Sequence, residues 1–111
     1  MRVSKHLKVL LMVFIDQHPS INNDYSINRL FASSSVLPDT ISVAKKLLLK
    51  QAFIVVKTEK NTVKYFAITT EGKLFLDSLN LESYLFKYTM KIDKTGFINS
   101  LVRKVIASKS I

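Results

Sequence analysis

The chain has 111 residues, which is the length of one domain with a single hydrophobic core. Hydrophobic residues make up 48% of it, with only two glycines and two prolines, so the composition excludes a disordered chain and favours long helices. The absence of cysteine excludes disulfides and thiolate metal sites, and 17 basic against 8 acidic side chains give a net charge of +9. This excess favours a polyanionic partner, although a lysine-rich solvated surface explains it equally well.

The first predicted helix spans about residues 5–17, with Ser4 as its N-cap. Apolar side chains cover almost its whole circumference, so the helix is either central in the core or shared with a second subunit. Its apolar run is too short to cross a membrane, and no signal-cleavage site follows it. We therefore expect a cytoplasmic protein without a membrane segment.

A second helix is predicted at about residues 27–33, after a polar loop, with Ser26 as its N-cap. Its inward residues are Ile27, Leu30 and Phe31. The three serines at 33–35 supply the turn into the next helix.

The third predicted helix begins at Pro38 and runs to about residue 51. Proline suits a first helical position because its missing N–H would have no partner there. Leu37 offers no capping side chain, so the first N–H groups of this helix lose an acceptor. Ile41, Ala44 and Leu48 recur at helical spacing and form the inward stripe. The outward positions are Thr40, Val43, Lys46 and Lys50.

Two strands are predicted next, at about residues 53–57 and 63–69, because both segments are rich in β-branched and aromatic residues. The polar residues 58–62 between them are few enough for a hairpin loop. A fourth helix follows at about residues 71–79, capped by Thr69 or Thr70. Its predicted inward residues are Leu74, Phe75 and Leu79.

The tail permits two interpretations between residues 81 and 92. Apolar residues fit a helical stripe, and alternation fits a strand about as well. We favour the helix, since an added strand has no identifiable partner. Residues 93–96 indicate a turn, and a last amphipathic helix is predicted over residues 97–107. Its apolar side is expected to hold Phe97, Leu101, Val102, Val105 and Ile106.

Two short segments resemble a known family. The first joins Thr40-Ile41-Ser42, then Leu48, to Gln51-Ala52-Phe53-Ile54, and the second is Ile68-Thr69-Thr70-Glu71-Gly72. The first is similar to the recognition helix, with the Gly-Leu-Val that follows it, in winged helix-turn-helix proteins of the MarR-like group. The second is similar to the Leu-Thr-x-x-Gly that follows the wing in the same group. The resemblance covers about residues 4–79.

This resemblance implies an α+β, mostly α fold with a three-helix core and a two-stranded wing. Residues 1–79 would form the winged helix-turn-helix domain, and residues 80–111 a C-terminal, helical dimerisation extension. It also implies sequence-specific binding of double-stranded DNA by a transcriptional regulator, with the third helix in the major groove and the wing on the backbone. Replication or plasmid maintenance would use the same fold.

The predicted DNA contacts lie on the third helix and the hairpin, which should together present one cationic face. They are Thr40, Ser42, Val43, Lys46 and Lys50 on the helix, and Lys57, Lys60, Asn61 and Lys64 on the hairpin. Between residues 39 and 64 there are six lysines and two acidic residues, a local balance of +4. Lysine neutralises phosphate or reaches guanine, hydroxyls donate to phosphates or base edges, and a valine touches a thymine methyl.

A rival hypothesis keeps the fold without DNA binding, as a protein-interaction module. It draws on Leu47, Leu49 and Asp39 and on the lack of arginine, the commonest bidentate base reader, on the third helix.

No enzyme, metal site or cofactor is predicted. The histidines, His6 and His18, have no acidic residue at metal-ligand spacing, and the carboxylates form no recognisable nucleophile motif. The aromatic residues of the tail (Tyr84, Phe86, Tyr88 and Phe97) indicate a homodimer formed through the C-terminal segment and the first helix, or a tail folded back on that helix.

Overall fold

The computed structural model of the chain describes residues 3–18, 20–59 and 63–109. These residues form six helices and one two-stranded antiparallel sheet, which confirms the predicted α+β, mostly helical class. In chain order the elements are α1 (Lys5–Gln17), α2 (Asp24–Phe31), α3 (Pro38–Lys50), β1 (Ile54–Glu59), β2 (Val63–Ile68), α4 (Thr70–Asp77), α5 (Leu81–Ile92) and α6 (Phe97–Lys109). Within the described residues, no helix is long and apolar enough to cross a membrane.

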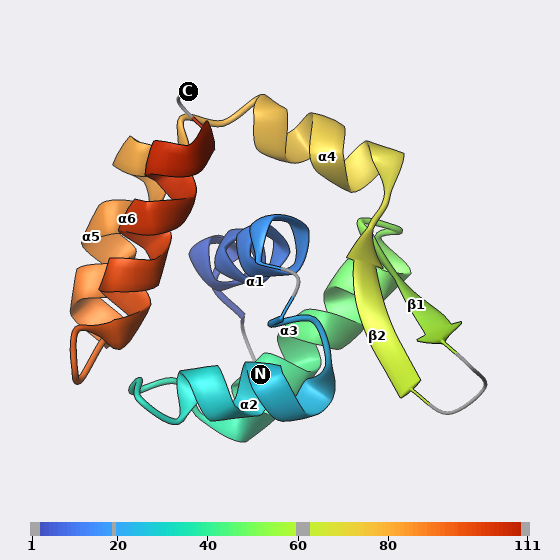
Figure 1. Cartoon of the computed structure of the whole chain (residues 1–111), viewed down its shortest axis with the longest axis horizontal. Coiled ribbons are helices and arrows are strands. Elements are labelled where there is room, and N and C mark those ends of the chain that lie inside the picture. Colours follow the sequence, from blue (N-terminus) through green and yellow to red (C-terminus); the bar gives the residue numbers. More distant parts are fainter. Residues whose placement is uncertain (1–2, 19, 60–62, 110–111) are drawn as a thin grey trace.

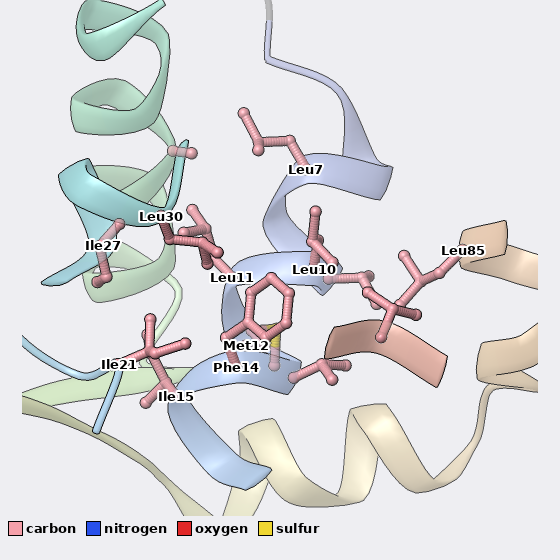
Figure 2. Packing of buried hydrophobic residues seen from close by; sticks show 14 of the residues in the cluster. Leu7, Leu10, Leu11, Met12, Phe14, Ile15, Ile21, Ile27, Leu30 and Leu85 are labelled. Atoms are coloured by element: carbon pink, nitrogen blue, oxygen red, sulfur yellow. The ribbon is translucent and has the colours of Figure 1, made fainter. Parts of the chain in front are cut away.

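Helix α1 lies at the centre of the molecule, and the other elements surround it (Figure 1). It has the predicted bounds, and the Ser4 hydroxyl accepts the N–H groups of His6 and Leu7 as predicted. Every residue from Val9 to Ile15 is buried, with at most 6% of its surface exposed. Figure 2 shows Leu11 on the side of α2 and Leu10 on the side of α5. The apolar surface of α1 is therefore covered by the chain itself.

Helix α2 begins earlier than predicted because Asn23, and not Ser26, is its N-cap. The Asn23 side chain accepts the Ser26 N–H at 2.8 Å, and the Ser26 hydroxyl accepts the Asn23 N–H at 3.2 Å. This reciprocal capping box satisfies two donors that a cap at Ser26 would leave unpaired. The predicted inward residues, Ile27, Leu30 and Phe31, are all buried.

Helix α3 begins at Pro38 as predicted, and Leu37 makes no side-chain capping bond. The inward stripe of Ile41, Ala44 and Leu48 is fully buried, with at most 1% of each residue exposed. The prediction of this helix and of its inward face is confirmed.

The turn between α2 and α3 is paired with the connection between α5 and α6. Ser34 and Asp93 form an isolated antiparallel β-bridge. The Ser35 N–H donates to the Ile92 carbonyl at 2.8 Å, and the Lys94 N–H donates to the Ser33 carbonyl at 2.9 Å. The end of the tail helix pair therefore braces the turn that leads into α3.

Helix α3 ends in a Schellman motif built on an alanine. The Phe53 N–H donates to the Leu48 carbonyl at 3.0 Å, and the Ala52 N–H donates to the Leu49 carbonyl at 3.1 Å. Ala52 has a φ of 61°, in the left-handed region where glycine is normally preferred. It occupies the place of the glycine in the family's Gly-Leu-Val.

We expect Ala52→Gly to raise the free energy of unfolding by roughly 0.5–1 kcal/mol. Glycine removes the steric cost of the left-handed backbone, and its larger entropy in the unfolded chain offsets part of that gain. Urea denaturation followed by circular dichroism measures the change. Ala107→Gly, in the exposed interior of α6, is the control and should destabilise the protein by roughly 1 kcal/mol. Destabilisation by both substitutions would contradict the expectation.

The two strands pair antiparallel, with Ile54 opposite Ile68 and Glu59 opposite Val63. Each lies within one or two residues of its predicted bounds. The sheet is tied to the loop after α1, because the Phe66 N–H donates to the Asn22 carbonyl at 2.6 Å. Lys60 and Asn61, predicted at the hairpin tip, lie outside the described residues.

The two segments that carry the family resemblance meet in space. The Thr69 N–H donates to the Phe53 carbonyl at 3.1 Å, and the Thr69 hydroxyl donates to the Ala52 carbonyl at 2.6 Å. The same hydroxyl caps α4 by accepting the Gly72 N–H at 3.0 Å. We call this meeting point of residues 51–54 with residues 68–72 the α3–α4 junction.

The inward face of α4 differs from the predicted one. Leu74 is 65% exposed, Phe75 is 36% exposed, and Leu76 is buried with 1% exposed. Leu79 is half-buried beyond the end of the helix. The placement of Leu74 inside was wrong, because the turn fixed by the Thr69 cap directs Gly72 and Leu76 toward the core.

The tail is helical, which confirms the favoured interpretation of residues 81–92. The tail lies against α1, as Figure 1 shows. In α6 the inward face begins with Ile98, which is fully buried, whereas Phe97 is 52% exposed and was wrongly placed inside. The Asp93 carboxylate accepts the Asn99 N–H at 2.8 Å, which fixes this rotation of the helix.

The surface on which the homodimer prediction rested is mostly covered. Tyr84, Phe86 and Tyr88 are half-buried and pack against the core, so Phe97 alone of the four aromatic residues is exposed. The apolar side of α1 is likewise occupied within the chain. The tail folds back on the first helix, and the structure lends the homodimer no support.

Candidate nucleic-acid interface

The outward face of α3 carries Asp39, Val43, Lys46 and Lys50, at intervals of three and four residues. Residues so spaced share one side of a helix, and this side lies opposite the buried stripe. Lys46 and Lys50 are exposed, and Val43 is half-buried. Among the described residues neither lysine has a carboxylate within 4 Å. Their amines are therefore free to contact an anionic partner.

Thr40 and Ser42, the two predicted hydroxyl contacts, are half-buried on either side of this stripe. They flank it rather than lie along it, because each is about a quarter of a helical turn from its centre. A partner that covers the stripe could still reach both hydroxyls.

Lys45 was counted in the local positive balance, but the fold uses its charge internally. Its ammonium forms an ion pair with Asp24, at the start of α2, and lies 5.8 Å from the centre of the Phe66 ring. The Lys45 side chain is only 11% exposed. This lysine therefore joins α2, α3 and the sheet, and it adds little to an external cationic face.

The wing lysines do not converge, which corrects the expectation of one cationic face. Lys57 lies opposite Tyr65, and Lys64 lies opposite Thr58. Because side chains alternate along a strand and directly opposed residues share a face, Lys57 and Lys64 project from opposite faces of the sheet. Lys64 shares the face of the buried Phe66. Only one of the two can stand on the same side as the α3 stripe.

The sequence did not reveal which apolar residues on α3 would remain exposed. Leu37, just before the helix, is 66% exposed, and Leu49 is 37% exposed, whereas Leu47 is half-buried. The helical spacing identified Leu48 as the inward one of the three consecutive leucines, but it did not show how far Leu47 and Leu49, on either side of it, would be covered.

The histidines occupy structural positions. His6 stacks on Tyr84 and Tyr88, and the Nδ1 atom of His18 lies 2.8 Å from the Ser20 hydroxyl oxygen. Within the part of the chain that is described, no three histidine or acidic residues are grouped so that they could hold a metal ion.

Comparisons with protein-family models, curated proteins and solved structures give no significant match to this chain.

Proposed function

We propose that the protein is a winged helix-turn-helix domain that binds double-stranded DNA as a regulator of transcription. In this proposal α2 and α3 are the helix-turn-helix, α3 enters the major groove, and β1 with β2 is the wing. The observation that carries the proposal is the stripe of α3, in which Lys46 and Lys50 are exposed opposite the buried face and have no carboxylate partner among the described residues.

The chemistry of this stripe suits a duplex. Lys46 and Lys50 can neutralise phosphates or reach guanine acceptors, and Val43 can contact a thymine methyl. Thr40 and Ser42 can donate to phosphates or base edges from the flanks. The net charge of +9 adds a long-range attraction to DNA that weakens with salt.

The test replaces two lysines of the stripe. Lys46→Gln with Lys50→Gln should weaken binding to a labelled duplex on the order of tenfold at low salt. It should also reduce the slope of log K against log salt by about 2, because each lost phosphate contact removes roughly 0.9. Fluorescence anisotropy across a series of salt concentrations measures both.

The matched control is Lys73→Gln with Lys104→Gln, which removes the same charge from exposed positions on α4 and α6. It should leave the slope nearly unchanged. Equal losses in the two double variants would mean that net charge alone accounts for binding, and the role of α3 would be wrong.

A second function, protein interaction without DNA binding, is favoured by the exposed Leu37 and Leu49 and by Asp39 on the stripe. A carboxylate at the N-terminal end of a DNA-facing stripe repels phosphate, whereas exposed leucines are common in protein interfaces. Gel-shift with bulk genomic DNA separates the two functions. The absence of any shift at low salt would favour the interaction module.

A further inference from the structure

Four exposed or half-buried lysines lie on α1 and α5, outside the predicted wing. Lys5 and Lys8 lie on α1, and Lys87 and Lys91 lie on the neighbouring α5. We call these four the α1–α5 patch. Lys5 and Lys8 line one hollow together with Leu48 and Gln51 from the end of α3. Lys87 and Lys91 line a second hollow of about 400 Å³, which Ser4 and His6 share.

The charges of this patch are not compensated within the described chain. None of the four lysines has a carboxylate within 4 Å, and the first turn of α1 holds no acidic residue. Lysines at the positive end of a helix, and two lysines four apart on α5, are both arrangements of unfavourable electrostatic energy. An anion bound to this surface would offset the unfavourable electrostatic energy of both arrangements.

The floor of the second hollow is a stack of aromatic rings. The His6 ring lies 4.4 Å from the Tyr84 ring and 5.5 Å from the Tyr88 ring, and both pairs are within about 25° of parallel. Burial raises the pKa of the Tyr88 hydroxyl above its usual value, and a hydrogen bond with Ser4 opposes that shift. The three stacked rings thus line the same hollow as Lys87 and Lys91.

This combination of features matches the sugar–phosphate backbone of a nucleic acid. Amines neutralise the phosphates, and flat ring surfaces beside them pack against sugars or bases. The first hollow places Lys5 and Lys8 beside Leu48, on the side of α3 that lies away from the stripe, so this surface is separate from the stripe.

We propose that the α1–α5 patch is a second phosphate-binding surface for nucleic acid, supplied partly by the tail that the sequence assigned to dimerisation. This inference rests on the proposed DNA-binding function and extends the contact surface beyond α3 and the wing. The tail then contributes affinity directly, through Lys87 and Lys91, as well as covering the core.

The experiment compares two double variants of equal charge in the full chain. Lys87→Gln with Lys91→Gln should lower the slope of log K against log salt by about 2 and weaken duplex binding on the order of tenfold at low salt. Lys73→Gln with Lys104→Gln, which lie outside the patch, should change neither value appreciably. Circular dichroism confirms that each variant is folded, since all four positions are exposed helical sites.

A spectroscopic readout locates the contact independently. On titration with a duplex, the ring resonances of Tyr84, Tyr88 and His6 should shift. The ring of Phe97, which is 52% exposed on α6 and lies outside both the patch and the proposed helix-turn-helix, is the internal control. Equal shifts of Phe97 and the patch rings would count against a defined site.

The outcomes separate this inference from the function on which it rests. If the wild type binds duplex and the Lys46/Lys50 variant loses affinity while the Lys87/Lys91 variant does not, the second surface is wrong and the proposed function stands. If the wild type binds no duplex at low salt, both fail. Binding to vesicles of phosphatidylglycerol that requires Lys87 and Lys91, with an unchanged salt slope on DNA, would overturn the inference and assign the patch to an acidic lipid surface.

Discussion

Leu76→Ala is expected to lower the free energy of unfolding by about 2–5 kcal/mol. Leu76 is 1% exposed and belongs to the core cluster around α1, so its truncation removes buried methyl groups and leaves a cavity. Urea denaturation monitored by circular dichroism measures the loss, and a loss near the upper limit would leave the chain largely unfolded at room temperature.

Leu74→Ala is the matched control, with the same change two residues away in the same helix. Because Leu74 is 65% exposed, its truncation should change the free energy of unfolding by less than about 0.5 kcal/mol. Similar losses for Leu74 and Leu76, or a larger loss for Leu74, would show that α4 presents the opposite face to the core.

Gly72→Ala is expected to destabilise the protein by about 1–3 kcal/mol, although alanine is the better helix former. A Cβ at this position would collide with the Phe53 carbonyl oxygen, and it would lie 3.1 Å from the Phe53 carbonyl carbon and 3.3 Å from Cγ2 of Ile68. The Phe53 carbonyl is held by the Thr69 N–H, so it cannot move without opening the α3–α4 junction.

Thermal denaturation of Gly72→Ala beside Lys73→Ala tests this steric argument. Lys73 is exposed in the same turn, so alanine there should leave the melting temperature almost unchanged. An unchanged melting temperature for Gly72→Ala as well would mean that α4 lies farther from β1 than the structure places it.

The sequence was sufficient to predict the bounds of a helix where a capping residue and a long apolar pattern indicate the same start. The bounds of α1 follow from the Ser4 cap, and the start of α3 follows from Pro38. The two family-like segments also have a physical reason that only the structure shows. The glycine in the second segment permits the close approach of α4 to the end of the first segment.

Pattern alone failed where a helix is short or apolar residues are consecutive. In α4 the residues Leu74, Phe75 and Leu76 are all apolar, and a helix of two turns offers too few repeats to choose its inward side. At the start of α6, Phe97 and Ile98 are both apolar, and the side that faces the core is set by the Asp93 carboxylate, which accepts the Asn99 N–H from the turn before the helix.

The candidate site was harder to predict than the fold, because the pairing and orientation of its lysine side chains depend on contacts between residues far apart in the sequence. Lys45 is paired with an acid 21 residues away. The opposite orientation of Lys57 and Lys64 depends on the register of the two strands. Lys87 and Lys91 belong to no motif, and only the packing of α5 beside α1 brings them into one hollow with Ser4 and His6.

The bridge between Ser34 and Asp93 has a practical consequence for how the protein can be divided. A chain that ends at residue 79 would lack the fully buried side chains of Leu85, Ile98 and Val102, which cover α1. It would also lack the backbone hydrogen bonds that hold the turn before α3. Residues 3–79 therefore depend on α5 and α6 for part of the cover of their core, and the roles of single residues are better tested by point substitution than by truncation.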